Sequence, residues 1–218
     1  MIYSKSNLQV VNVTSKDKDI NVLSHVHFNK DGSTAGIDGR AIMVVEPAPA
    51  EYREHFIVDS IEHESFNIPA NSVKEVIKNI PPDTRFKGLL EQVAITKDEE
   101  AGVELTTTDG QQLKKVQTRK HRKPFPEVKD MLRDAYSKET VRVCVNRTRL
   151  IKLLNAIDKA CPDSSNENPV FIEMAKDSGE IVIRAKNMKT GQLAIGLMSQ
   201  YEGEWLKRSL WEKEIMET

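Results

Sequence analysis

Residues 64–81 read ESFNIPANSVKEVIKNIP, and this stretch predicts a short strand followed directly by a helix. Four apolar residues recur at the spacing of one helical face: Val73, Val76, Ile77 and Ile80. Asn71 or Ser72 is placed to cap the start of this helix, and Pro81 and the next proline end it.

A three-stranded meander follows this helix, and the same pattern occurs three times in the chain. The copies occupy residues 22–46, 91–117 and 169–198. Each has runs of roughly alternating apolar residues, rich in β-branched types, separated by polar turns that hold Asp and Gly, which favour tight turns. The repetition predicts a fold built from copies of one supersecondary unit.

The third meander is also preceded by a strand and a helix. Residues 141–145 (VRVCV) read as the strand, and Asn146 is placed to cap the helix. The apolar face of this helix holds Leu150, Leu153, Leu154, Ile157 and Cys161. The repeated unit is therefore β-α-β-β-β. The first copy is expected to lack a good helix, because residues 8–20 are rich in Val, Asn and Thr, which are poor helix formers.

The amino-acid composition limits the classes of function that this chain can have. The chain of 218 residues holds 32 basic and 33 acidic side chains, which argues against a uniformly basic nucleic-acid-binding protein but allows basic patches. Two cysteines, Cys144 and Cys161, cannot form a disulfide framework, so a reducing cytoplasmic location is expected. No apolar run reaches the roughly 18 residues of a membrane helix, so no membrane partner is expected.

Positive charge gathers in two places. Residues 114–123 (KKVQTRKHRK) contain six basic residues and no acid, and the helix after Asn146 carries cations opposite its apolar face. An isolated run of charge is most often a solvated surface, whereas a cationic layer on helices also suits contact with phosphates.

The order of these segments resembles the bacterial sliding clamp, the β subunit of the replicative DNA polymerase. Residues 20–46 look like the first meander of that family, residues 64–81 like the next strand and helix, and residues 103–116 like its TDG-turn segment. The segment KPFPEVKDML is similar to the linker that closes a domain, residues 140–160 to the strand and helix of the next domain, and GQLAIGLMSQY to a closing strand.

The resemblance implies an α+β fold of repeated β-α-β-β-β half-modules of the DNA-clamp type, with antiparallel sheets and helices on one face. It implies a clamp-like domain of two half-modules over residues 1–135, a third half-module over residues 136–202, and a C-terminal amphipathic tail over residues 203–218. Helices line the DNA channel in this family. The expected DNA-binding residues, from the helices and from the basic run, are Arg149, Lys152, Lys159, Lys74, Lys78, Lys114, Lys115, Arg119, Lys120, Arg122 and Lys123.

The chain also departs from the family pattern. It holds about three half-modules where the family has six, it has an insert at residues 46–64, and its tail has no counterpart. Three half-modules leave a sheet edge uncovered, so a homo-oligomer is expected. If a ring needs twelve half-modules, four such chains would close it.

The tail has two interpretations. Its apolar residues are compatible with a short amphipathic helix, and the expected partner-binding residues are Trp205, Leu206, Leu210 and Trp211. They either pack on their own domain or dock on a partner or a neighbouring subunit.

Enzyme signatures are missing from the sequence: it has no phosphate-cradling Gly-rich loop, no G-x-S-x-G and no H-E-x-x-H. His25 and His27 alternate on a strand and would need His55 or His63 to bind a metal. No metal and no cofactor is therefore expected.

The sequence favours a non-enzymatic processivity factor. It would tether a polymerase or another DNA-replication or DNA-processing protein to duplex DNA, independently of DNA sequence. One alternative is a clamp-fold scaffold for interaction or oligomerisation that does not bind DNA. A less favoured one is a metal-dependent nuclease, suggested by Asp83 with Glu127 and Lys129.

Overall fold

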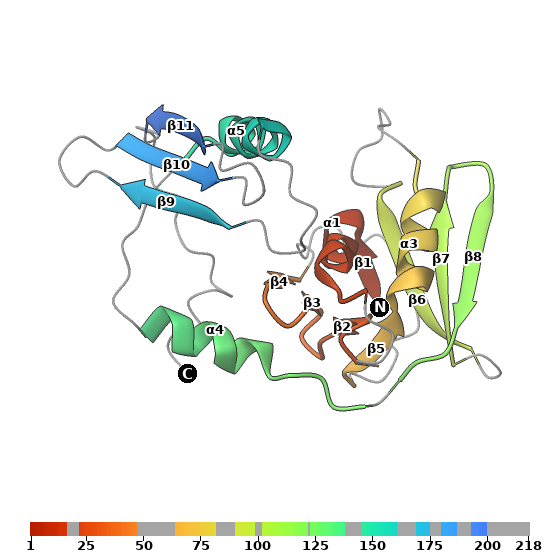
Figure 1. Cartoon of the computed structure of the whole chain (residues 1–218). Coiled ribbons are helices and arrows are strands. Elements are labelled where there is room, and N and C mark those ends of the chain that lie inside the picture. The colour runs from red at the N-terminus through yellow and green to blue at the C-terminus, as the bar shows by residue number, and fades with distance from the viewer. Residues whose placement is uncertain are drawn as a thin grey trace. The chain divides into compact units, whose positions relative to one another are not determined.

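The computed structural model describes residues 1–16, 22–47, 64–81, 90–98, 102–121, 123–137, 145–160, 169–174, 180–186 and 193–199. These residues fall into two compact units, unit 1 within Met1–Ala135 and unit 2 within Tyr136–Glu217 (Figure 1). Unit 1 holds the larger core and unit 2 a smaller one.

Unit 1 contains the same order of elements twice. The first copy is β1 (Ile2–Ser4), α1 (Lys5–Leu8), the 3-10 helix η1 (Gln9–Val13), β2 (His25–Phe28), β3 (Thr34–Ile37) and β4 (Ile42–Val45). The second copy is β5 (Phe66–Pro69), α3 (Ala70–Asn79), β6 (Gln92–Asp98), β7 (Gly102–Thr108) and β8 (Leu113–Thr118). The strand β1 was not anticipated from the sequence. The expected lack of a good helix over residues 8–20 is confirmed in the described part of that range, because Gln9–Val13 forms only a 3-10 helix of five residues.

The two copies exchange their first strands. The sheets have the orders β4-β3-β2-β5 and β1-β6-β7-β8, and every pairing in them is antiparallel. The first strand of each copy therefore closes the sheet of the other copy: Tyr3 pairs with Val93, and Val26 pairs with Ile68. Neither copy is complete without the other.

The helices and both sheets share one core. Buried side chains from β1, β2, β5, β6 and β7 meet those of α1, η1 and α3, and the largest fully buried ones include Tyr3, Phe28 and Leu105. Tyr3 and Phe28 form an edge-to-face pair with ring centroids 4.9 Å apart. This core links the two copies into one domain.

The turns also repeat. The turn between β3 and β4 holds Asp38 and Gly39, and the turn between β7 and β8 holds Asp109 and Gly110. In both turns the carboxylate accepts hydrogen bonds from the two backbone N–H groups beyond the glycine, and the glycine has a positive φ. These bonds lower the pKa of both aspartates. The Asp-Gly turn chemistry expected from the sequence is confirmed.

One predicted helix cap is confirmed and the other is wrong. The backbone N–H of Arg149 donates to Asn146 Oδ1 at 3.1 Å, so Asn146 caps its helix as predicted. The earlier helix begins at Ala70, ahead of Asn71 and Ser72, and has no side-chain cap. The Ala70 N–H instead donates to the Ser24 carbonyl oxygen, while the Ser72 hydroxyl donates to Thr118.

A further helix, α4 (Val128–Ser137), corrects the expectation that helices lie on one face only. Val128 and Leu132 of α4 pack with Phe125 against Ala35 and Ile37 of β3. Gly36, between those two strand residues, approaches η1 on the opposite face. The sheet β4-β3-β2-β5 is therefore covered on both faces: Ala35 and Ile37 meet α4, and Gly36 meets η1.

Unit 2 consists of α5 (Arg147–Ala160) and the three-stranded sheet of β9 (Val170–Met174), β10 (Glu180–Lys186) and β11 (Leu193–Ser199), in the order β11-β10-β9. Ile157 of α5 is buried with Ile181 and Ile183 of β10. The strand predicted over residues 141–145 lies outside the described residues, apart from Val145. The α+β class with antiparallel sheets is confirmed, whereas the assignment to clamp half-modules stays a prediction.

Candidate functional site

Three of the predicted DNA contacts lie on α5. Arg149, Lys152 and Lys159 are exposed, while the opposite side of the helix packs on the sheet through Leu153 and Ile157. The helix forms because its apolar residues recur at three-and-four spacing beneath an Asn146 cap. It therefore presents cations to solvent from a rigid support.

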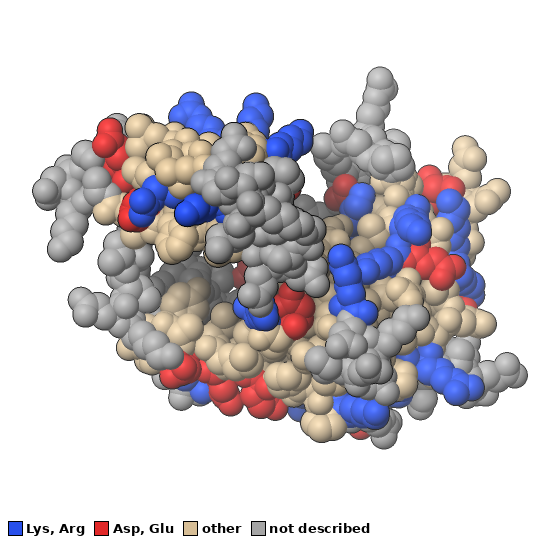
Figure 2. All heavy atoms as spheres, in the orientation of Figure 1, with Lys and Arg blue, Asp and Glu red and all other residues tan. Residues whose placement is uncertain are grey.

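The helix α3 offers the same arrangement in unit 1. Val73 and Val76 are fully buried, and Lys74 and Lys78 are exposed one turn apart. Glu75 is exposed beside them, so this surface carries both signs of charge. Figure 2 shows Lys and Arg side chains over the part of unit 1 that holds α3 and β8, with Asp and Glu among them.

The basic run at residues 114–123 does not form one surface. Strand alternation places Lys114 on the same face as the buried Val116 and Lys115 on the opposite face, and both lysines are exposed. Lys114 Nζ lies 3.9 Å from Asp109 Oδ2, and Lys115 Nζ lies 2.9 Å from Glu104 Oε1. Acidic groups therefore partly neutralise both cations.

The rest of the run follows β8. Arg119 and Lys123 are exposed, Lys120 is half-buried, and Arg122 lies outside the described residues. Lysines that are adjacent in the sequence therefore lie on different surfaces of the structure. The predicted partner-binding residues also lie outside the described residues: Trp205, Leu206, Leu210 and Trp211.

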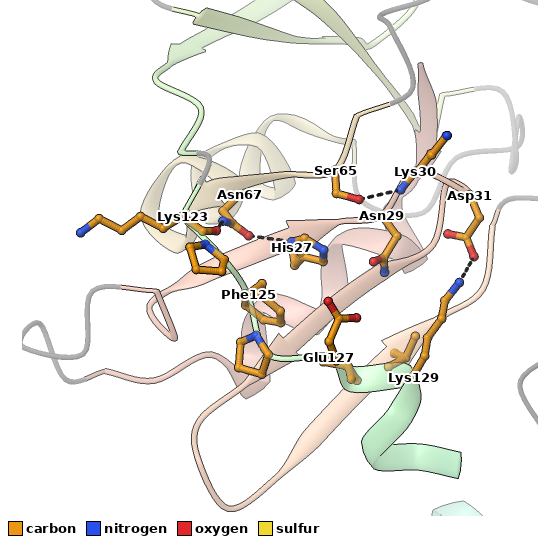
Figure 3. Close-up of a pocket in the computed structure, with 14 residues that line it drawn as sticks. His27, Asn29, Lys30, Asp31, Ser65, Asn67, Lys123, Phe125, Glu127 and Lys129 are labelled. Carbon is orange, nitrogen blue, oxygen red and sulfur yellow. Dashed lines mark hydrogen bonds and ion pairs between the residues drawn. The ribbon is translucent and has the colours of Figure 1, made fainter. Parts of the chain in front are cut away.

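Sequence reasoning missed a pocket beneath the linker that joins β8 to α4. The cavity has a volume of about 820 Å³, and residues from β2, β5 and the linker line it (Figure 3). Phe125 stacks on His27, with ring centroids 4.6 Å apart and the ring planes 5° from parallel. His121 meets His25 edge-on at 4.7 Å. The linker therefore packs against the two alternating histidines of β2, His25 and His27.

Asn67 fastens the linker to the strands. Its side-chain oxygen lies 2.7 Å from His27 Nδ1, and its amide nitrogen donates to the carbonyl oxygens of His121 and Lys123 at 3.2 and 2.8 Å. The backbones of Asn67 and His121 also exchange hydrogen bonds at 3.0 and 2.9 Å. A buried Asn in this position holds the linker at a fixed distance from the sheet.

The rim of the pocket carries both signs of charge. Lys129 Nζ donates to Asp31 Oδ2 at 2.7 Å, and Lys30, Lys123 and Glu127 also line the cavity. Burial lowers the pKa of His27, so neutral imidazole is favoured there. This mixed lining suits a peptide segment better than a phosphate backbone, because the carboxylates would repel phosphates.

In the part of the chain that the structure describes, no group of three His, Cys, Asp or Glu side chains is placed to hold a metal ion. Lys129 and Glu127 of the nuclease alternative both line the linker pocket, but Asp83 lies outside the described residues.

None of the described helices has both the length and the apolar character needed to cross a membrane. No protein-family model and no curated protein matches this chain.

Proposed function

We propose that this chain is a sliding-clamp-like DNA-binding protein that tethers a polymerase or another DNA-processing protein to duplex DNA, without catalysis of its own. The observation that carries the proposal is the doubled β-α-β-β-β order of unit 1 with its exchanged first strands. In that arrangement α1, η1 and α3 contact one another beside the sheets.

Exposed cations on the helices support the DNA-binding part of the proposal. A protein that follows duplex DNA needs phosphate contacts that ignore base sequence. Lys74 and Lys78 on α3, and Lys152 and Lys159 on α5, are exposed on helices that the sheets support from the other side. The near-neutral net charge of the chain is compatible with such local layers.

Salt-dependent binding to a non-specific duplex tests this proposal. Each phosphate contact contributes about −0.9 to the slope of log affinity against log salt. Replacing Lys152 with Ala should flatten the slope by about one unit, and replacing Lys152 and Lys159 together by about one to two units. Fluorescence anisotropy at several salt concentrations measures the slope.

Lys186→Ala is the matched control, because Lys186 is an exposed lysine of the same unit on β10, not on the helix. It should leave the slope unchanged. A slope that stays the same in a folded Lys152→Ala variant would show that α5 does not contact DNA. Cleavage of the duplex on addition of divalent cations would favour the nuclease alternative instead.

A second candidate is an interaction scaffold that does not bind DNA. It is favoured by the apolar residues that unit 2 exposes on its sheet, among them Phe171, Ile172 and Leu197. A scaffold would form assemblies while showing no salt-dependent duplex binding. For either function, the linker pocket offers a site for a partner's peptide segment.

A further inference from the structure

Within the described residues, β9 lies at an edge of the sheet of unit 2. Among the described residues, β9 pairs only with β10, whereas β2 and β6 in unit 1 each pair on both sides. All five residues of β9 are exposed. An edge strand with apolar side chains is a template for pairing with another chain.

The strand β9 occupies the position in unit 2 that β6 occupies in unit 1. Ile172 pairs with Ile183 of the next strand, as Ile95 pairs with Leu105. The helices ahead of the two strands have the same apolar spacing: Val73, Val76, Ile77 and Ile80 in α3, and Leu150, Leu153, Leu154 and Ile157 in α5. The two segments are therefore equivalent residue by residue.

Equivalent side chains differ sharply in exposure. Ile95 is 0% exposed and Ile172 is 58% exposed; Val93 is 0% exposed and Val170 is 39% exposed. Ile172 and Val170 lie on the helix side of the sheet, because they pair with the buried Ile183 and Ala185. The side of β9 that should belong to a core is therefore uncovered within the described residues.

In unit 1, a strand covers the position that corresponds to the edge of β9. The first strand of the other copy, β1, pairs with β6 and brings the buried Tyr3 beside Val93. The cover is reciprocal, since β5 pairs with β2 in the same way. Each β-α-β-β-β copy in unit 1 therefore completes the sheet of the other copy.

We propose that a second copy of this chain covers β9, so that two copies of unit 2 complete one domain across a two-fold axis. Two copies of the chain are identical, so a reciprocal contact between them uses the same surface on both copies and is isologous. The surface is the free edge of β9 with the helix-side residues Val170, Ile172 and Met174. The inference stands apart from DNA binding.

The mass of the full chain in solution tests the proposal. Multi-angle light scattering should give twice the chain mass of 24.7 kDa, or an even multiple of it. Ile172→Lys should weaken the association by at least about 100-fold, because an ammonium group would be buried without a partner. The monomer tolerates this change, since Ile172 is already exposed in it.

Leu197→Lys is the matched control. Leu197 is 61% exposed and pairs with Val182, which alternates with the buried Ile181 and Ile183, so it lies on the sheet face away from α5. It should leave the mass unchanged. A monomeric wild type at about 100 µM, or an assembly that resists Ile172→Lys, would overturn the proposal.

Hydrogen exchange identifies the occupant independently. The β9 amides that do not pair with β10 should be protected in the assembled wild type and lose that protection in Ile172→Lys. Protection that persists in a strict monomer would overturn the proposal, because it would assign the cover to another segment of the same chain. Neither experiment contains DNA, so failure here leaves the proposed DNA binding standing.

Discussion

At the scale of single residues, His27 connects the linker to the sheet. Its ring stacks on Phe125 and its Nδ1 lies 2.7 Å from the Asn67 side-chain oxygen. Burial lowers the pKa of this histidine, more than the hydrogen bond to Asn67 raises it. Folding therefore disfavours the charged ring, and the linker contact is sensitive to acid.

This predicts a pH dependence of stability. The unfolded chain binds a proton at His27 near pH 6.5 and the folded chain only at lower pH, so the unfolded state binds more protons below about pH 6.5. Stability is then retained above that pH and falls below it, by at most about 1.4 kcal/mol per pH unit for this one group.

The His27→Gln variant removes this titration. Its free energy of unfolding, measured by urea denaturation between about pH 7.5 and about pH 5.5, should fall less than that of the wild type. The other histidines are present in both proteins and cancel in the comparison. Parallel curves for the two proteins would contradict the prediction.

At the scale of elements, two glycines allow helices to approach strands closely. A Cβ at Gly36 of β3 would overlap the carbonyl oxygen of Val10 in η1 and lie 3.0 Å from its carbonyl carbon. A Cβ at Gly196 of β11 would overlap the Leu153 side chain of α5, with Cγ at 2.9 Å. The first neighbour is backbone and the second is a flexible side chain.

Gly36→Ala should therefore destabilise its unit more than Gly196→Ala destabilises its own. We expect about 3 kcal/mol or more for Gly36→Ala and about 1–2 kcal/mol for Gly196→Ala, since the Leu153 rotamer can adjust and the η1 backbone cannot. Urea unfolding followed by circular dichroism measures both. Equal costs would mean that η1 shifts as easily as a side chain.

At the scale of the whole molecule, the two units differ in how much core they hold. Among the described residues, the main core of unit 1 contains 17 buried apolar residues, and that of unit 2 contains five. Buried apolar surface is the main source of folding stability. Unit 2 should therefore open more readily than unit 1.

Hydrogen exchange checks this difference. At about 1 µM protein, where association is weakest, the amides of β10 should exchange at a lower free energy of opening than those of β7. At about 100 µM the gap should narrow, because assembly through β9 would stabilise unit 2 alone. Equal protection of β7 and β10 at both concentrations would contradict the prediction.

Much of the fold follows from local sequence. Alternating apolar residues define the strands of the three meanders, the three-and-four spacing defines α3 and α5, and Asp-Gly pairs define the turns. Asn146 caps α5 as predicted. These features depend on backbone preferences and on side chains a few residues apart, so they can be predicted without knowledge of long-range contacts.

Contacts between residues far apart in the sequence determine the remaining features of the fold and of the pocket. The strand β1 forms because β6, which lies far away in the sequence, supplies its partner, and α3 starts at Ala70 because the Ser24 carbonyl oxygen receives its N–H. The linker pocket requires His27, Asn67 and Phe125 from three distant segments. The sequence by itself determined the repeated unit and the helix cations, whereas the exchange of first strands and the linker pocket depend on tertiary pairing, which no local pattern encodes.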